Sequence, residues 1–108
     1  MNEITNDTLK CKLALEALQY VIDPEIGLNV VDLGLIYQIN FDEVNSKILV
    51  VMTLTTQYCP MGDSITNAVK NALEAAFKGM ETSIDLAFDP SWSHQMISET
   101  GKQFLNLA

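Results

Sequence analysis

The feature that most constrains the fold is an almost wholly apolar run at residues 48–54, which reads Ile-Leu-Val-Val-Met-Thr-Leu. A short run rich in β-branched side chains is typical of a strand, and its lack of polar alternation predicts that both faces are covered. We therefore expect this strand near the centre of a sheet. Such a strand needs neighbours, so the rest of the chain must supply further strands and covering helices.

Two other segments have the period of two that strands require. Residues 35–42 form the first, and residues 43–46 join it to the central run with the length of a hairpin turn. Residues 82–88 alternate in the same way until Asp89-Pro90 breaks the pattern. The sequence thus predicts a small sheet of three strands.

Helical spacing predicts three helices around these strands, in the order helix-strand-strand-helix-strand-helix. This order is typical of a compact two-layer α+β domain, with a small mixed three-stranded sheet packed by helices. We expect one domain over residues 1–108, with a flexible N-terminus at residues 1–6. The first helix carries Leu15, Leu18 and Ile22 and ends before Pro24; the second, capped by Asp63 or Ser64, carries Ile65, Val69, Leu73 and Ala76 and ends at Gly79; the third starts after Ser93 and ends near Gly101.

The charge of the chain excludes several classes of partner. Its 108 residues include 14 acidic and 6 basic side chains, giving a formal net charge of −8. All the basic residues are lysines, so the chain has no arginine for phosphate or base recognition, and no nucleic acid is expected as a partner. No apolar run approaches the roughly 20 residues of a membrane span, and the polar N-terminus lacks a signal peptide. We expect a soluble cytoplasmic protein that binds no membrane.

The common nucleotide and metal motifs are missing from the sequence. It has no GxGxxG, no phosphate-binding loop, no paired CxxC and no HExxH. Nucleotide hydrolysis, dinucleotide chemistry and a zinc finger are therefore unsupported. The two cysteines, Cys11 and Cys59, are expected to be free thiols in a reducing compartment.

Cys59 is the most informative candidate residue because it lies between the central strand and the second helix. The N-terminus of a helix stabilises a thiolate, which makes cysteine a better nucleophile or soft-metal ligand. The alternative is a small apolar plug between loop and helix. Cys11 lies within the first helix and is expected to have no chemical role.

Several polar residues could support the chemistry of Cys59 or could have only a structural role. Asp23 and Glu25 flank Pro24 in a loop and could face a metal or a basic partner, or simply cap and solvate that loop. His94 follows Ser93 at a helix start, where the neutral imidazole that binds metal is favoured, although an exposed and idle histidine is the commoner case. Asp32 could hold a turn, and Trp92 is expected to be a packing anchor.

Four blocks of sequence stand out when they are taken together: Asp23-Pro24-Glu25, Val31-Asp32-Leu33-Gly34-Leu35, Thr53-Leu54-Thr55 running to Cys59-Pro60, and Asp89-Pro90-Ser91-Trp92-Ser93. In this order and spacing they resemble the SufT-like family of iron-sulfur cluster assembly proteins. The resemblance spans nearly the whole chain and agrees with the α+β fold. It implies a non-enzymatic factor that helps deliver clusters to apo-proteins, in the stand-alone form without a fused ATPase or a cysteine-rich tail, and with Cys59 as reactive centre.

The ligand count limits the mechanism that this resemblance implies. A cluster usually takes four protein ligands, mostly thiolates, which one such chain cannot supply. Cys59 would therefore share a transient iron ion or cluster with a second copy in a homodimer, an assembly or client protein, or small thiols, with Asp23, Glu25, Thr55 and His94 as supporting residues. Two alternatives stay open: a metal-free adaptor of the assembly machinery, and a thiol enzyme in which His94 is the base for Cys59.

Overall fold

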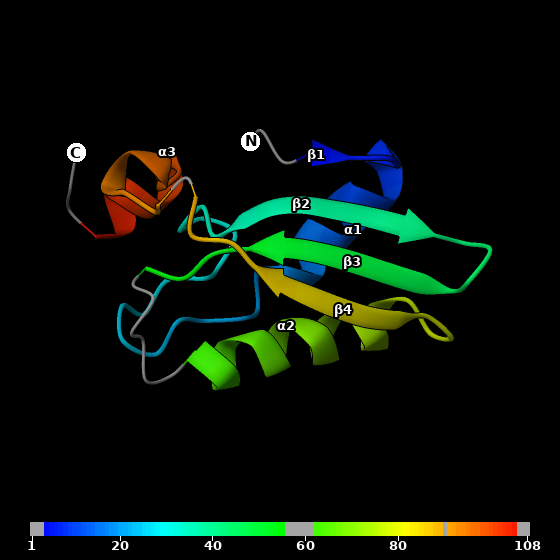
Figure 1. The fold of residues 1–108 in the computed structure, drawn as a ribbon. Coiled ribbons are helices and arrows are strands. Elements are labelled where there is room, and N and C mark those ends of the chain that lie inside the picture. The colour runs from blue at the N-terminus through cyan, green and yellow to red at the C-terminus, as the bar shows by residue number, and fades with distance from the viewer. Residues whose placement is uncertain (1–3, 56–61, 90, 106–108) are drawn as a thin grey trace.

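The computed structural model describes residues 4–55, 62–89 and 91–105, which form a sheet with helices packed against it (Figure 1). The predicted α+β class is confirmed, and each predicted strand is present. The elements in chain order are β1 (Ile4–Thr5), α1 (Thr8–Leu18), β2 (Ile36–Asp42), β3 (Lys47–Met52), α2 (Gly62–Ala76), β4 (Glu81–Leu86), the 3₁₀ helix η1 (His94–Met96) and α3 (Glu99–Phe104).

The sheet has the order β1-β2-β3-β4 and is mixed, as predicted. β2 and β3 form the expected antiparallel hairpin, while β1 pairs parallel to β2 and β4 parallel to β3. β1 is an addition to the predicted strands, because two residues are too few to show a period of two. The expected flexible segment, residues 1–6, therefore differs in its second half: Ile4 and Thr5 pair with β2, and Asn6 bonds to Phe41.

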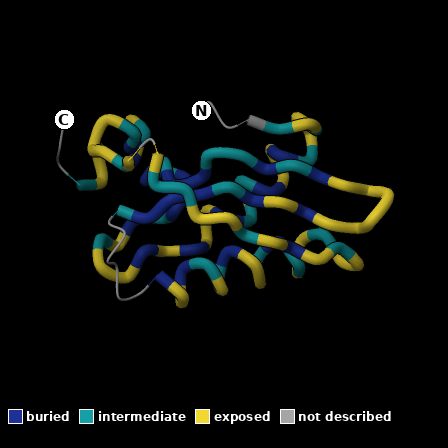
Figure 2. The backbone as a smooth tube through the Cα atoms, in the orientation of Figure 1, coloured by how far each residue is buried: buried dark blue, intermediate teal, exposed yellow. Residues whose placement is uncertain are grey.

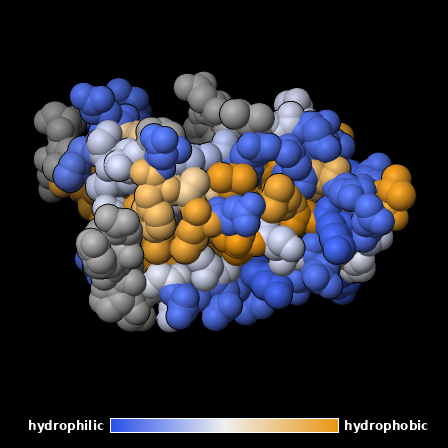
Figure 3. Space-filling view, viewed as in Figure 1, coloured by the Kyte–Doolittle hydropathy of each residue, from blue (hydrophilic) through white to orange (hydrophobic). Residues whose placement is uncertain are grey.

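β3 occupies the predicted interior position, but the prediction that both its faces are covered is wrong. Ile48, Val50 and Met52 are fully buried, whereas Leu49 between them is 37% exposed. Both long helices pack on the face that Ile48 and Val50 share, and no described helix covers the face of Leu49 (Figure 1). Figure 3 shows hydrophobic side chains at the surface of that uncovered face.

The core lies between the sheet and the two long helices, where the buried residues gather (Figure 2). Residues Ile65, Val69 and Leu73 of α2 are buried as predicted, whereas Ala76 is exposed. Phe77 takes its place and packs against Phe41, with ring centroids 5.3 Å apart. The predicted buried face of α2 is thus confirmed for Ile65, Val69 and Leu73 and wrong for Ala76.

α1 ends at Leu18, one turn earlier than predicted. The next residues enter a bridge instead: the Val30 N–H donates to the Val21 carbonyl at 2.9 Å, and Ile22 pairs with Asn29. Ile22 is consequently 49% exposed rather than part of the buried helix face. Tertiary hydrogen bonds have overridden the helical spacing here.

The other helix boundaries also differ from the prediction. α2 already includes Gly62, so Asp63 and Ser64 lie in its first turn instead of capping it. The single last helix that was expected is two short ones, and the cap of α3 is Ser98, whose Oγ accepts from the Gly101 N–H at 3.0 Å. Extended backbone at the buried Ile97 separates the two.

Among the described residues, no helix combines the length and apolarity that crossing a bilayer requires.

Candidate functional site

The described parts of the four sequence blocks lie at one end of the sheet (Figure 1). β2 begins at this end, and β3 and β4 both end there, so the connections that carry the blocks start or finish together. The N-terminus of α2 reaches the same end. The fold therefore gathers segments that are far apart in the sequence into one candidate site.

Asp23 organises the first block through a turn of the backbone. Its Oδ1 accepts from the Glu25 N–H at 2.9 Å, its N–H donates to the Leu28 carbonyl at 3.0 Å, and its own carbonyl accepts from the Gly27 N–H at 2.7 Å. Asp23 is only 1% exposed, while Glu25 is exposed. The two carboxylates thus have different roles, since one lies inside the fold and the other on its surface.

The second carboxylate oxygen of Asp23 is the most unusual atom of the site. Oδ2 is buried and accepts no hydrogen bond from any described residue. A buried carboxylate oxygen without a donor destabilises the fold, and such atoms call for an explanation in function or in a bound ligand. Sequence reasoning named Asp23 but could not foresee this, because burial follows from the whole fold.

The second and fourth blocks meet and hold each other. The Trp92 Nε1–H donates to the Leu33 carbonyl at 2.6 Å, across 59 residues of sequence. Gly34 lies so close to Met96 that a Cβ on Gly34 would be 2.9 Å from the Met96 Cβ and closer still to its carbonyl oxygen. Gly34 also has a φ of +78°, so this contact depends on glycine twice over.

Asp32 continues this junction with both of its carboxylate oxygens. Ser98 Oγ donates to Oδ1 at 2.8 Å, and Asn29 Nδ2 donates to Oδ2 at 2.7 Å. The Ser98 N–H adds a bond to the Asp32 carbonyl at 2.8 Å. Asp32 does hold a turn, as its sequence position suggested, and it also fastens the cap of α3 to that turn.

The third block continues β3 beyond Met52 and bonds to the start of β2. The Thr53 N–H donates to the Leu35 carbonyl at 2.8 Å. The Thr53 side chain hydrogen-bonds to Tyr37, whose pKa is raised above its ordinary value because burial disfavours the phenolate, although that hydrogen bond lowers it in part. Thr55 follows, half-buried.

Cys59 itself lies outside the described residues, within the gap at 56–61. The described segments on the two sides of this gap lie close together, because a Cβ placed on Gly62 would be 2.9 Å from Leu54 Cδ1. The absence of a side chain at Gly62 thus leaves room for the Leu54 side chain, which follows β3, at the start of α2.

His94 is exposed and packs beside Trp92, with ring centroids 5.2 Å apart. Within the described part of the chain, no three His, Cys, Asp or Glu side chains lie close enough to hold a metal ion together. A ligand set built from Asp23, Glu25 and His94 alone is therefore not formed. The assignment of His94 as a supporting residue, like that of Thr55, stays a prediction.

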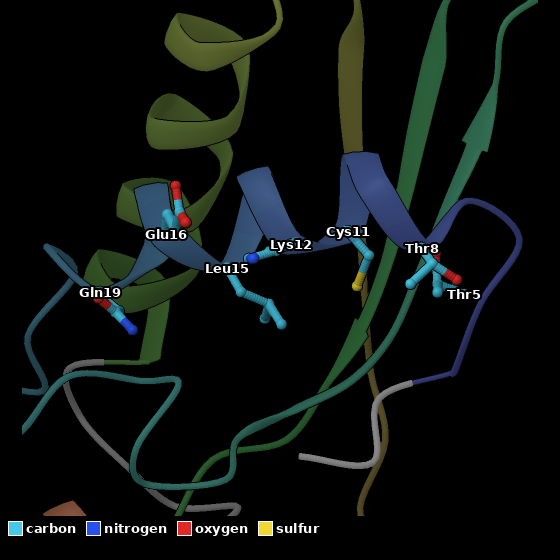
Figure 4. A pocket seen from close by; sticks show the side chains of 7 residues that line it. All are labelled: Thr5, Thr8, Cys11, Lys12, Leu15, Glu16 and Gln19. Carbon is cyan, nitrogen blue, oxygen red and sulfur yellow. The ribbon is translucent and has the colours of Figure 1, made fainter.

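A separate cavity of about 400 Å³ runs along α1 (Figure 4). Cys11 and Leu15 both point into it, and Lys12, Glu16 and Gln19 line it as well. None of the four sequence blocks contributes to its lining. Cys11 is 5% exposed and belongs to the core, which fits the structural role expected of it.

Comparison with known proteins bears directly on the resemblance inferred from these blocks. The iron-sulfur cluster assembly protein model matches residues 14–86. The Fe-S protein maturation auxiliary factor SufT of Staphylococcus aureus is 38% identical over 88 residues, which cover 82% of this chain and 99% of that relative. The corresponding factor YitW of Bacillus subtilis is 34% identical over 91 residues, covering 84% of this chain and 88% of the relative.

Solved structures share the fold as well as the sequence. A domain of unknown function from Bacillus anthracis is similar with a TM-score of 0.82 and 34% identity, covering 91% of this chain and 92% of that one. A conserved hypothetical protein from Thermotoga maritima has a TM-score of 0.73 and 33% identity, covering 96% of both chains. By sequence and by fold, the chain belongs to the family of iron-sulfur cluster assembly proteins.

Proposed function

We propose that this chain is a maturation factor that helps to deliver iron-sulfur clusters to apo-proteins, with Cys59 as its reactive thiol. The observation that supports the proposal is the meeting of the described blocks at the end of the sheet where β3 leads towards Cys59 and α2 begins. The relatives named as maturation auxiliary factors support the same role.

The chemistry of this role is ligand exchange, in which no electrons are transferred to or from the protein. Cys59 would lose its proton and bind iron through Sγ, and thiolates of the client would later displace it. Since four ligands are usual and Cys59 supplies one, the others come from a second copy of the chain, from an assembly partner or from small thiols. The chain is a carrier in this scheme and not an enzyme.

Asp23 is the described residue with the strongest case for assisting Cys59. Its buried Oδ2 has a lone pair that no described donor uses, in the same end of the molecule. A carboxylate oxygen can bind iron or accept a proton released from a thiol. Glu25, being exposed, is better suited to contact a partner.

Anaerobic reconstitution with iron and sulfide tests the proposal. The wild type is expected to develop a visible chromophore with bound iron, and Cys59→Ser to lose it. Cys11→Ala is the matched control, because it removes a thiol from the core of α1 and should leave the chromophore unchanged. Circular dichroism establishes that each variant folds, and native mass shows whether the cluster is shared in a dimer.

Two results would contradict the carrier. If the Cys59→Ser protein kept its bound iron, or if cells that carry this variant matured client enzymes normally, Cys59 would not be the reactive thiol. Client maturation that survives Cys59→Ser but fails on Glu25→Lys would favour the metal-free adaptor. Turnover of a thioester that is lost on His94→Ala would favour the thiol enzyme.

A further inference from the structure

The outer edge of β4 presents backbone groups that the sheet does not use. The N–H groups of Glu81 and Ala87 donate inward, to the carbonyls of Ser46 and Met52 at 2.9 and 2.8 Å. In a parallel pair every second residue bonds to the same neighbour, so Ser83 and Asp85 also face β3. The N–H and carbonyl groups of the residues between them, at 82, 84 and 86, therefore point away from the sheet.

Only the first of these outward N–H groups has a partner among the described residues. The Thr82 N–H donates to Glu74 Oε2 of α2 at 3.0 Å. The outward N–H groups of Ile84 and Leu86 meet no acceptor in the described part of the chain. An unpaired strand edge of this kind is a template for another strand.

On the opposite side of the sheet, a short strand and one side chain take up outward backbone groups of β2. β1 pairs with Gln38 and Ile39 of β2. After β1, the Asn6 side chain takes up both backbone groups of one further residue of β2: its Nδ2 donates to the Phe41 carbonyl at 2.8 Å, and its Oδ1 accepts from the Phe41 N–H at 2.9 Å. β4 has one such capping bond, at its first outward residue.

A groove runs between the open edge of β4 and α2. It has a volume of about 330 Å³, and Asn67 and Lys70 line it from α2 while Thr82 and Ile84 line it from β4. Figure 1 shows α2 running alongside β4 over most of the strand. A strip of open backbone beside a helix suits one extended segment, which can hydrogen-bond to the edge and place alternate side chains against the helix.

We propose that this groove binds an extended segment of another protein in which basic and apolar residues alternate. Thr82, Ile84 and Leu86 lie on the sheet face that bears the core, as their register partners Ile48, Val50 and Met52 show. Leu86 is 46% exposed there, so apolar residues of the added strand would cover it.

The other face of β4 determines the charge of the partner. Its charged side chains are Glu81 and Asp85, both exposed, and Asp85 is opposite the uncharged Val51 of β3. Residues directly opposite one another on neighbouring strands share a face, and opposite charges there are stabilising. A lysine or arginine opposite Asp85 would provide this pair. Lys70 of α2 lines the groove on the other face and repels basic residues of the partner there. The partner is therefore expected to place basic residues on the face of Asp85 and apolar residues on the face of α2, in alternation.

A second copy of the chain is a poorer occupant of the same edge. Pairing two β4 strands would bring together two faces whose charged side chains are acidic, on chains of net charge −8 each. Like charges across a strand pair are destabilising. α2 alongside the edge would also have to fit against its own copy.

The test uses the full chain with a short capped peptide of alternating lysine and valine, and a control peptide of the same composition in two blocks. We expect the alternating peptide to slow hydrogen exchange at the amides of Ile84 and Leu86, about tenfold when it is present at about ten times its Kd. The block peptide should leave both amides unprotected. Equal protection by both peptides, or none by either, overturns the proposal.

Two pairs of variants separate backbone pairing from general attraction to an acidic protein. Ile84→Pro removes an outward N–H without removing a bond to β3, and should weaken binding about tenfold or more, whereas Ile84→Val should not. Asp85→Lys should weaken binding strongly, and Glu16→Lys, which changes net charge equally on α1, should do so less than about twofold. Equal losses from the two lysine variants would refute the site, even if the proline variant did not fold.

Discussion

Replacing Gly34 with alanine tests whether the close contact with Met96 holds the candidate site together. Gly34 has a φ of +78°, and an added Cβ would meet the Met96 backbone carbonyl, which cannot move without moving η1. Gly27→Ala is the matched control, because Gly27 has a φ of +85° with no atom within 4 Å of the added Cβ. The two variants share the backbone strain and differ in the steric clash.

The expected costs can be worked out from these contacts. A non-glycine residue in the left-handed region costs about 1–2 kcal/mol, and both variants incur this. Gly34→Ala must also displace the segment that Trp92 and Ser98 fasten through hydrogen bonds to the Leu33 and Asp32 carbonyls. Two hydrogen bonds at about 1 kcal/mol each, with part of the burial of Ile97, give an excess of about 2–4 kcal/mol.

Urea denaturation followed by circular dichroism measures both free energies of unfolding. Trp92 is the one tryptophan in the sequence, so its fluorescence reports displacement of the segment separately from unfolding. We expect a changed emission spectrum for native Gly34→Ala and an unchanged one for Gly27→Ala. If the two variants lost stability to within about 0.5 kcal/mol of each other, the contact would not be what holds the segment.

Substitutions at three further residues have expected outcomes that the structure determines. Thr53→Val should raise the pKa of Tyr37 further, because the Thr53 hydrogen bond lowers it in the wild type, and an ultraviolet titration of the tyrosine measures this. The raised pKa of Tyr37 also means that the free energy of unfolding should fall as the pH rises past the ordinary tyrosine value of 10.0. Hydrogen bonds from Asn45 lower the pKa of Asp42, so the stability that they contribute is lost as the pH falls through the acid range. The free energy of unfolding of Asp42→Asn should therefore depend less on pH in that range than that of the wild type. Asp23→Asn should be at least as stable to urea as the wild type, because a neutral amide replaces the unpaired oxygen, whereas Asp23→Ala should lose about 1 kcal/mol with its turn hydrogen bond.

The sequence predicted those parts of the fold that depend on repeated apolar spacing. The stripe Ile65, Val69 and Leu73 repeats over several turns and is buried as predicted. The alternation over residues 35–42 correctly predicted a strand and the burial of Ile39 and Phe41, but a register shift between Ile36 and Gln38 breaks the period at its start, where Ile36 is buried and Tyr37 is not. β1 has no such repetition, since its two residues become a strand only through pairing with Gln38 and Ile39. The end of α1 was misplaced for a similar reason.

The candidate site was harder to predict because it depends on pairs of residues that are distant in the sequence. Nothing near Leu33 indicates that its carbonyl will accept from Trp92, and nothing near Ser98 indicates a bond to Asp32. Motif order correctly indicated the family, yet it could not separate residues that build the site from residues that act in it.

Hydrogen bonding separates two acids that looked alike in the sequence. Asp32 has a donor on each carboxylate oxygen, from Ser98 and from Asn29, so its place in the fold accounts for it fully. Asp23 is buried more deeply than Asp32, but only its Oδ1 has a donor among the described residues, and the turn that it holds needs no more than that. An asparagine could form the same turn without the desolvation cost of a carboxylate. Stability alone therefore does not explain the acid at this position, and of the two described candidates the buried Asp23 has a stronger claim than the exposed His94 to the supporting role proposed above.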